Sequence, residues 1–241
     1  MLTIALALTA LCTALLSGIF GMAGGMLLMG VYVGLLPVPT AMVMHGGTQL
    51  VANMSRAVIL RRHVYWKGFG CYVLGALAAF AALSSLRYSP APLVVFVGLG
   101  LTPFVAAILP ASWLDFQQPR AAVVTGFQVA AVQLLAGSAG PLLDIAFVDT
   151  RLNRSQVVAT KAVTQVFSHA LKLVYFIRAA RLGDISLPLV VALLVATLAG
   201  TRLGTAILDR ISETAFKRYS RAIVYAVGGV YLYRAGALLL D

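Results

Sequence analysis

Gly21-Met22-Ala23-Gly24-Gly25 and Gly137-Ser138-Ala139-Gly140-Pro141 are two short glycine-bearing stretches, each inside a long apolar run. They lie 116 residues apart, and the same offset relates Thr48-Gln49 to Thr164-Gln165. The two halves of the chain therefore carry the same unit. A corresponding pair of glycine- or proline-interrupted apolar segments is typical of membrane proteins that bind a solute between two repeats.

The composition places the chain in a membrane. Of the 241 residues, 61% are hydrophobic and only 10% are charged, and the mean hydropathy is +0.96. A soluble domain of this length could not bury so much apolar surface, and several runs approach the roughly 20 residues that span a bilayer. We therefore expect an integral, multi-pass protein whose partner is the lipid bilayer.

The net charge of +11 could indicate a nucleic-acid partner, but the basic residues flank apolar runs rather than forming one stripe. Cationic loops facing a cytoplasm explain them better, so we expect no nucleic-acid binding. Cys12 and Cys71 stand singly in apolar stretches. This spacing indicates neither a disulfide nor a metal site.

Residues 2–36 form an apolar segment that one helix could not accommodate. At 35 residues it would be about 52 Å long, against a hydrocarbon core of roughly 30 Å. It must break, and the glycines at 21–25 are the place. Residues 2–18 lack the positive flank of a signal peptide, and the second copy lies in mid-chain, so we interpret them as retained structure.

The predicted fold is an all-α polytopic membrane protein with two internal repeats, each a broken helical segment plus three transmembrane helices. We place the first repeat at residues 1–110, a linker at 111–120 and the second repeat at 121–241. The six unbroken helices are expected at about 40–60, 68–86, 91–109, 155–177, 185–207 and 215–239, and the second broken segment at 121–149.

The basic residues decide between two topologies. If each broken segment crosses the membrane once, seven loop or terminal basic residues fall on each side. If each folds back as a hairpin, the split is ten to four, which the positive-inside rule favours. The larger group is Arg61, Arg62, Lys67, Arg120, Arg151, Arg154, Arg210, Lys217, Arg218 and Arg221, and the smaller is Arg87, Arg178, Arg181 and Arg234. The hairpins make the repeats inverted and place both termini outside.

The glycine breaks are candidate binding elements. An interrupted helix leaves N–H groups unpaired, which is tolerated only inside protein or beside a wet cavity, and such groups favour an anion. The alternative is close helix packing through small residues. The candidate substrate-binding residues here are Gly21, Gly24, Gly25, Gly137, Ser138 and Gly140.

Each break is followed by a helix with a polar stripe. The stripes are His45, Gln49, Asn53 and Arg56 in the first repeat, and Lys161, Gln165, His169 and Lys172 in the second. Both follow one helical face and lack carboxylates, which suits an anionic substrate. Alternatively, Arg56 and Lys172 extend to the interface while the amides join helices. We expect His45, Gln49, Lys161 and Gln165 to lie deeper than Arg56 and Lys172.

Asp144 follows the second break and is the one acid expected within the membrane. It could accept a coupling proton or pair with Lys161, and we favour pairing. The chain has no nucleophile triad, phosphate loop, metal-ligand spacing or redox motif. We therefore predict neither an enzyme nor a cofactor.

At these residues the sequence resembles the sulfite exporter TauE/SafE family of membrane permeases. The resemblance rests on Phe20 to Gly25, Val51 to Ser55, Arg61-Arg62-His63 and Ala159 to Gln165. It implies a permease that transports sulfur-containing anions, such as sulfite or sulfonates, across a cytoplasmic membrane of bacterial type. The sequence leaves open a passive anion channel, a membrane-embedded structural subunit and a homodimeric assembly.

Overall fold

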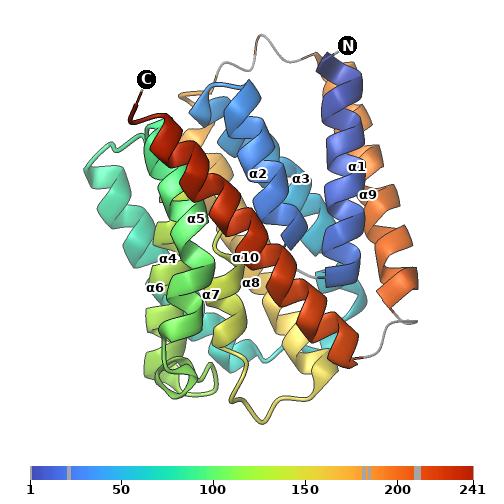
Figure 1. The fold of residues 1–241 in the computed structure, drawn as a ribbon. Coiled ribbons are helices and arrows are strands. Elements are labelled where there is room, and N and C mark those ends of the chain that lie inside the picture. The colour runs from blue at the N-terminus through green and yellow to red at the C-terminus, as the bar shows by residue number, and fades with distance from the viewer. Residues whose placement is uncertain (1, 21–22, 181–182, 184–185, 209–212, 241) are drawn as a thin grey trace.

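The computed structural model describes residues 2–20, 23–180, 183, 186–208 and 213–240, which form helices and connections without a strand (Figure 1). The six unbroken helices all begin and end within two residues of the predicted bounds. The helices are α1 (Leu2–Phe20), α2 (Ala23–Leu35), α3 (Val38–Ile59), α4 (Trp66–Ser85), α5 (Pro92–Ile108), α6 (Pro119–Ala136), α7 (Gly140–Ile145), α8 (Arg154–Phe176), α9 (Leu187–Leu208) and α10 (Glu213–Ala237), with short 3-10 turns at Arg61–His63 and Ala111–Leu114.

The first broken segment folds back as a hairpin. Helix α2 returns along α1, so that Gly24 lies against Thr13 and Ser17 of the preceding helix. A β-carbon on Gly24 would overlap the Thr13 carbonyl oxygen. The absence of a side chain at Gly24 therefore allows the two helix backbones to meet.

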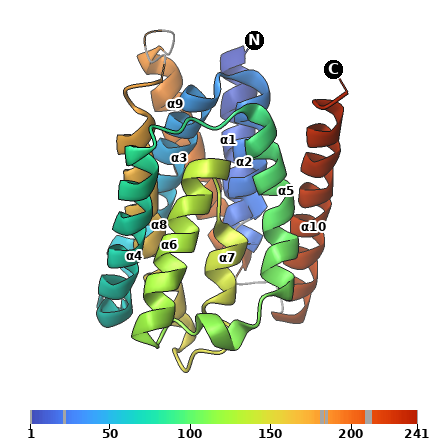
Figure 2. The same cartoon turned by 90° about the vertical axis from the view of Figure 1, so that its left-hand side faces the viewer.

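The second broken segment also folds back, with the short helix α7 running beside α6 (Figure 2). Gly137 ends α6 in the left-handed conformation, with φ 82°. A β-carbon there would be strained and would also collide with the Met29 side chain. Glycine is required at this turn for both reasons.

The two hairpins point in opposite directions. The end of α1 and the start of α2 lie away from the chain termini, whereas α6 rises toward them before α7 descends (Figures 1 and 2). Both termini lie at the same end of the molecule. The repeats, α1–α5 and α6–α10, are thus inverted. The exact boundaries at residues 110 and 120 stay a prediction.

The repeats interlock rather than standing side by side. Helix α1 packs along α9, α4 packs along α6, and α3 and α5 pack against their counterparts α8 and α10 of the other repeat. Glycines form the seams: a β-carbon on Gly75 would overlap the carbonyl oxygen of Val123, and one on Gly204 would overlap that of Leu15. These close backbone approaches hold helices of different repeats together.

Three of the described helices are both long and apolar enough to cross a bilayer: Trp66–Ser85, Pro119–Ala136 and Leu187–Ile207. Helices α1, α2 and α5 are apolar but shorter. Helices α3 and α8 are less apolar because they carry the two polar stripes. Helix α8 begins with a capping box: the side chains of Asn153 and Gln156 each accept a hydrogen bond from the backbone N–H of the other residue.

Candidate functional site

The polar stripes of α3 and α8 meet in the protein interior. Lys172 is fully buried and His45 is 1% exposed. Lys172 Nζ lies 2.7 Å from His45 Nδ1 and donates a hydrogen bond of 2.9 Å to the carbonyl oxygen of Gly137. The amine is therefore held at the second glycine break by a residue from each repeat.

The other nitrogen of His45 is bound at the first break. His45 Nε2 lies 2.8 Å from the Gly25 carbonyl oxygen, which can only accept, so Nε2 carries the proton. Nδ1 is then an acceptor and takes its hydrogen bond from Lys172. One continuous path, Gly25–His45–Lys172–Gly137, joins the two breaks.

The amine of Lys172 has no counter-ion nearby. Across the part of the chain that the structure describes, the single ion pair joins Lys161 to Asp144, and no carboxylate lies within ion-pair distance of Lys172. A buried charge is costly unless it is paired. The arrangement is therefore suited to receiving an anion.

A second polar group completes the centre. Gln133 Nε2, in α6, lies 2.8 Å from His169 Nδ1, and His169 Nε2 lies 3.0 Å from Gln165 Oε1. Because the Gln133 amide nitrogen can only donate, His169 is neutral, with its proton on Nε2. The rings of His45 and His169 lie 5.6 Å apart. The sequence analysis missed Gln133, since it is a lone polar residue whose partner lies 36 positions away.

Gln49 lies one turn beyond His45 on α3. Gln49 is 8% exposed, and its side-chain amide has no hydrogen bond to any described residue. A β-carbon on Gly25 would lie 3.6 Å from it, so Gln49 borders the first break. Asn53 Nδ2 donates a hydrogen bond of 2.9 Å to the backbone carbonyl oxygen of Gln49 and leaves the Gln49 side chain free. Gln49 therefore supplies uncommitted amide donors beside Lys172 and His45, which we call the central pair.

Lys161 belongs to a different location. It forms an ion pair with Asp144, and the two side chains are 25% and 38% exposed. Eleven residues separate Lys161 from Lys172 on α8, about 16 Å of helix. One small anion cannot contact both. The expectation that Lys161 lies deeper than Lys172 is wrong, because the Lys172 side chain points inward to the glycine breaks. Arg56, the other residue expected to lie less deep, is half-buried.

The remaining predicted site residues are distributed unevenly. Gly24 faces Thr13 and Ser17 of α1. Ser138 and Gly140 are buried beside Gly137 in the second turn, and Gly21 lies outside the described residues. The substrate contacts expected of these four residues, and of Lys161, stay predictions.

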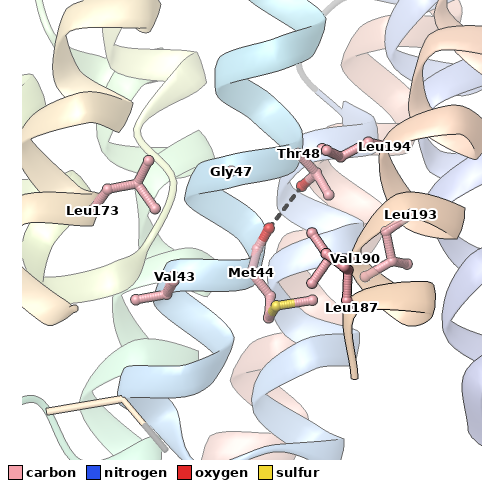
Figure 3. Close-up of a pocket in the computed structure, with 9 residues that line it drawn as sticks. All are labelled: Val43, Met44, Gly47, Thr48, Leu173, Leu187, Val190, Leu193 and Leu194. Carbon is pink, nitrogen blue, oxygen red and sulfur yellow. Dashed lines mark hydrogen bonds between the residues drawn. The ribbon is translucent and has the colours of Figure 1, made fainter. Parts of the chain in front are cut away.

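An apolar cavity of about 320 Å³ lies between α3, α8 and the start of α9 (Figure 3). Val43, Met44 and Gly47 line it from α3, Leu173 from α8, and leucines and a valine from the start of α9. Its one polar side chain, Thr48, donates 3.1 Å to the Met44 carbonyl oxygen within the same helix. The cavity therefore offers no binding group for an anion.

Comparison with known proteins identifies the family. The chain matches the family model described as sulfite exporter TauE/SafE over residues 6–232. No curated protein and no solved structure matches the chain. The match covers both repeats, including the hairpins and the polar helices. The chain is thus a multi-pass integral membrane protein that belongs to the sulfite exporter TauE/SafE family of membrane transporters.

Proposed function

We propose that this protein is a secondary transporter that exports a small sulfur-containing anion, such as sulfite or a sulfonate, with Lys172 as its anion-binding charge. The observation that carries the proposal is the burial of Lys172 without a carboxylate partner in the described structure. Family membership supports the class of substrate. The charge-assisted hydrogen bonds of a lysine are well suited to an oxyanion.

The position of the pair supports an alternating-access mechanism. His45 lies on α3 of the first repeat and Lys172 on α8 of the second, and their hydrogen bond joins two helices that pack against each other across the repeats. In transporters with inverted repeats, the site lies at the repeat interface, and rocking of one part against another exposes it to each side in turn. A shift of α8 against α3 would open this contact, while the carbonyl oxygens of Gly25 and Gly137 keep each residue bound to the hairpin of its own repeat.

The test is sulfite uptake into proteoliposomes that contain the purified protein. We expect wild type to accumulate sulfite above its external concentration when an ion gradient is imposed. Lys172→Met keeps an unbranched side chain one atom shorter but removes the amine, and should lower sulfite affinity by about 10- to 100-fold. Lys67→Met, on the exposed start of α4, is the matched control and should transport normally.

Two results would contradict the proposal. Equilibration of sulfite without accumulation under every imposed gradient would indicate a passive channel. Normal affinity in a folded Lys172→Met protein would place the anion elsewhere, and Lys161→Met would then be the next variant to assay.

A further inference from the structure

The central pair presents a hydrogen-bond donor and an acceptor side by side. Because His45 Nε2 donates to the Gly25 carbonyl oxygen, His45 Nδ1 offers a lone pair and the Lys172 amine is the donor of the pair. We propose that the substrate is a monoanion that itself carries a hydrogen-bond donor, as hydrogen sulfite does, and that it binds between Lys172 and His45. This inference rests on the proposed function and names the substrate form that the site selects.

The hydrogen bonds of Lys172 and His45 define what an inserted anion must satisfy. Lys172 and His45 contact each other directly at 2.7 Å, so an anion that lies between them replaces that contact. An S–O oxygen can accept from Lys172, but His45 Nδ1 then needs a new donor. At 1% exposure, His45 has no access to bulk water, and a buried acceptor left unpaired costs about 1–3 kcal/mol.

His45 cannot readily become the donor. Its Nε2 proton is committed to the Gly25 carbonyl oxygen, so donation from Nδ1 as well would require a second positive charge beside Lys172. His169, whose ring lies 5.6 Å from that of His45, is held neutral by Gln133 and Gln165. No carboxylate among the described residues approaches to balance an added charge. The acceptor is thus a fixed property of the site.

The charge of the site leads to the same substrate form. With both histidines neutral, the protonated Lys172 that an anion requires contributes a single positive charge. A monoanion neutralises it, whereas a dianion would leave one uncompensated negative charge in the interior. Hydrogen sulfite fits both requirements, since it carries one negative charge and one O–H group; the sulfite dianion fits neither.

Two stable monoanions of nearly equal size separate the requirement for a donor from that for charge. Sulfamate carries an NH₂ group on sulfur, where methanesulfonate carries a methyl group. We expect sulfamate to bind wild type at least about tenfold more tightly than methanesulfonate, since the site rejects an analogue that leaves its acceptor unpaired. Isothermal titration of the purified protein with each anion measures the ratio.

Variants of His45 test whether the preference for sulfamate over methanesulfonate depends on the acceptor His45 Nδ1. His45→Phe removes Nδ1, and the two anions should then bind within about twofold of each other. His45→Gln can donate to Gly25 and still offer an oxygen to the substrate, so it should retain the preference. Equal affinities in wild type, or a preference that persists in His45→Phe, would overturn the inference. Should His45→Phe fail to fold, the wild-type ratio together with that of His45→Gln still decides.

The outcome is distinguishable from failure of the proposed function. If wild type binds sulfite and both analogues equally, and binding needs Lys172, the transporter proposal stands and the selection of a donor-bearing form is wrong. If wild type binds none of the three anions, both proposals are wrong.

Discussion

Lys172 Nζ lies 2.7 Å from His45 Nδ1, although 127 positions separate the two residues in the chain. The first residue belongs to α8 of the second repeat and the second to α3 of the first. Each is also bound to the backbone at the break of its own hairpin, Gly137 and Gly25 respectively. Any movement that separates α3 from α8 must therefore break this contact or replace it with a ligand.

The inverted arrangement predicts where labels reach the protein. Cysteines at Arg62 and Arg154 should react only from the cytoplasmic side, and one at Arg87 only from outside, because the positive-inside rule orients the connections. All three side chains are exposed. Labelling of intact cells and of inverted vesicles with an impermeant maleimide measures this, in a background without Cys12 and Cys71. Reaction of Arg62→Cys from the outside would show that the protein has the opposite orientation in the membrane.

Gly24 and Gly25 are neighbours with different surroundings. Gly24→Ala should lower the free energy of unfolding by about 1–3 kcal/mol, because its β-carbon would overlap the Thr13 carbonyl oxygen. Gly25→Ala meets only Gln49 at 3.6 Å and should cost well under half as much. Thermal unfolding of both variants in detergent gives the comparison.

The same pair of variants tests whether Gly24 contacts substrate. Sulfite stabilises the folded state by mass action, so its thermal shift reports binding apart from stability. A Gly24→Ala protein with normal stability and no sulfite-induced shift would support the contact predicted from the sequence. A destabilised protein with a normal shift would assign Gly24 to helix packing alone.

The ion pair between Lys161 and Asp144 should contribute little to stability. Because both side chains are partly exposed, at 25% and 38%, Asp144→Asn should lower the free energy of unfolding by no more than about 1 kcal/mol. Exchanging the two residues, Lys161→Asp with Asp144→Lys, should restore it. Chemical denaturation of the three proteins provides the values, and a loss above about 3 kcal/mol would show a structural role beyond a surface pair.

The glycine seam between α4 and α6 should be intolerant of a methyl group. Gly75→Ala would overlap the carbonyl oxygen of Val123 and force the helices apart, so we expect a loss of about 1–3 kcal/mol. Gly70→Ala is a matched control in the same helix, where the added carbon has open space, and it should be neutral or stabilising. A lower unfolding temperature for Gly70→Ala than for Gly75→Ala would contradict the close packing of α4 and α6 at Gly75.

Local sequence signals predicted the helices and their hairpins well. Glycines and prolines mark the ends of the apolar runs, and the ten-to-four distribution of basic residues favours folding back at both breaks. The helical period also placed the polar residues of α3 and α8 on one face. These features depend on neighbouring residues or on the bilayer, and both can be read without tertiary contacts.

The order of burial along α8 could not be predicted in this way. Periodicity assigns Lys161 and Lys172 to the same face but says nothing about what packs against each. Lys161 is neutralised by Asp144 from α7, whereas Lys172 reaches His45 and Gly137, which are distant in sequence. Gln133 was missed for the same reason, since its function depends on His169 in another helix.

The interlocking of the repeats has a consequence for biosynthesis. The seam between Gly75 and Val123 joins residues 48 positions apart and can close soon after α6 has been made. Its counterpart between Gly18 and Gly204 spans 186 positions, so α1 leaves the ribosome long before its partner exists. The contact between α4 and α6 can therefore form during translation, whereas the equivalent contact between α1 and α9 forms only near its end. A chain that stops before α9 would leave the packing face of α1 open to lipid and to quality-control proteases.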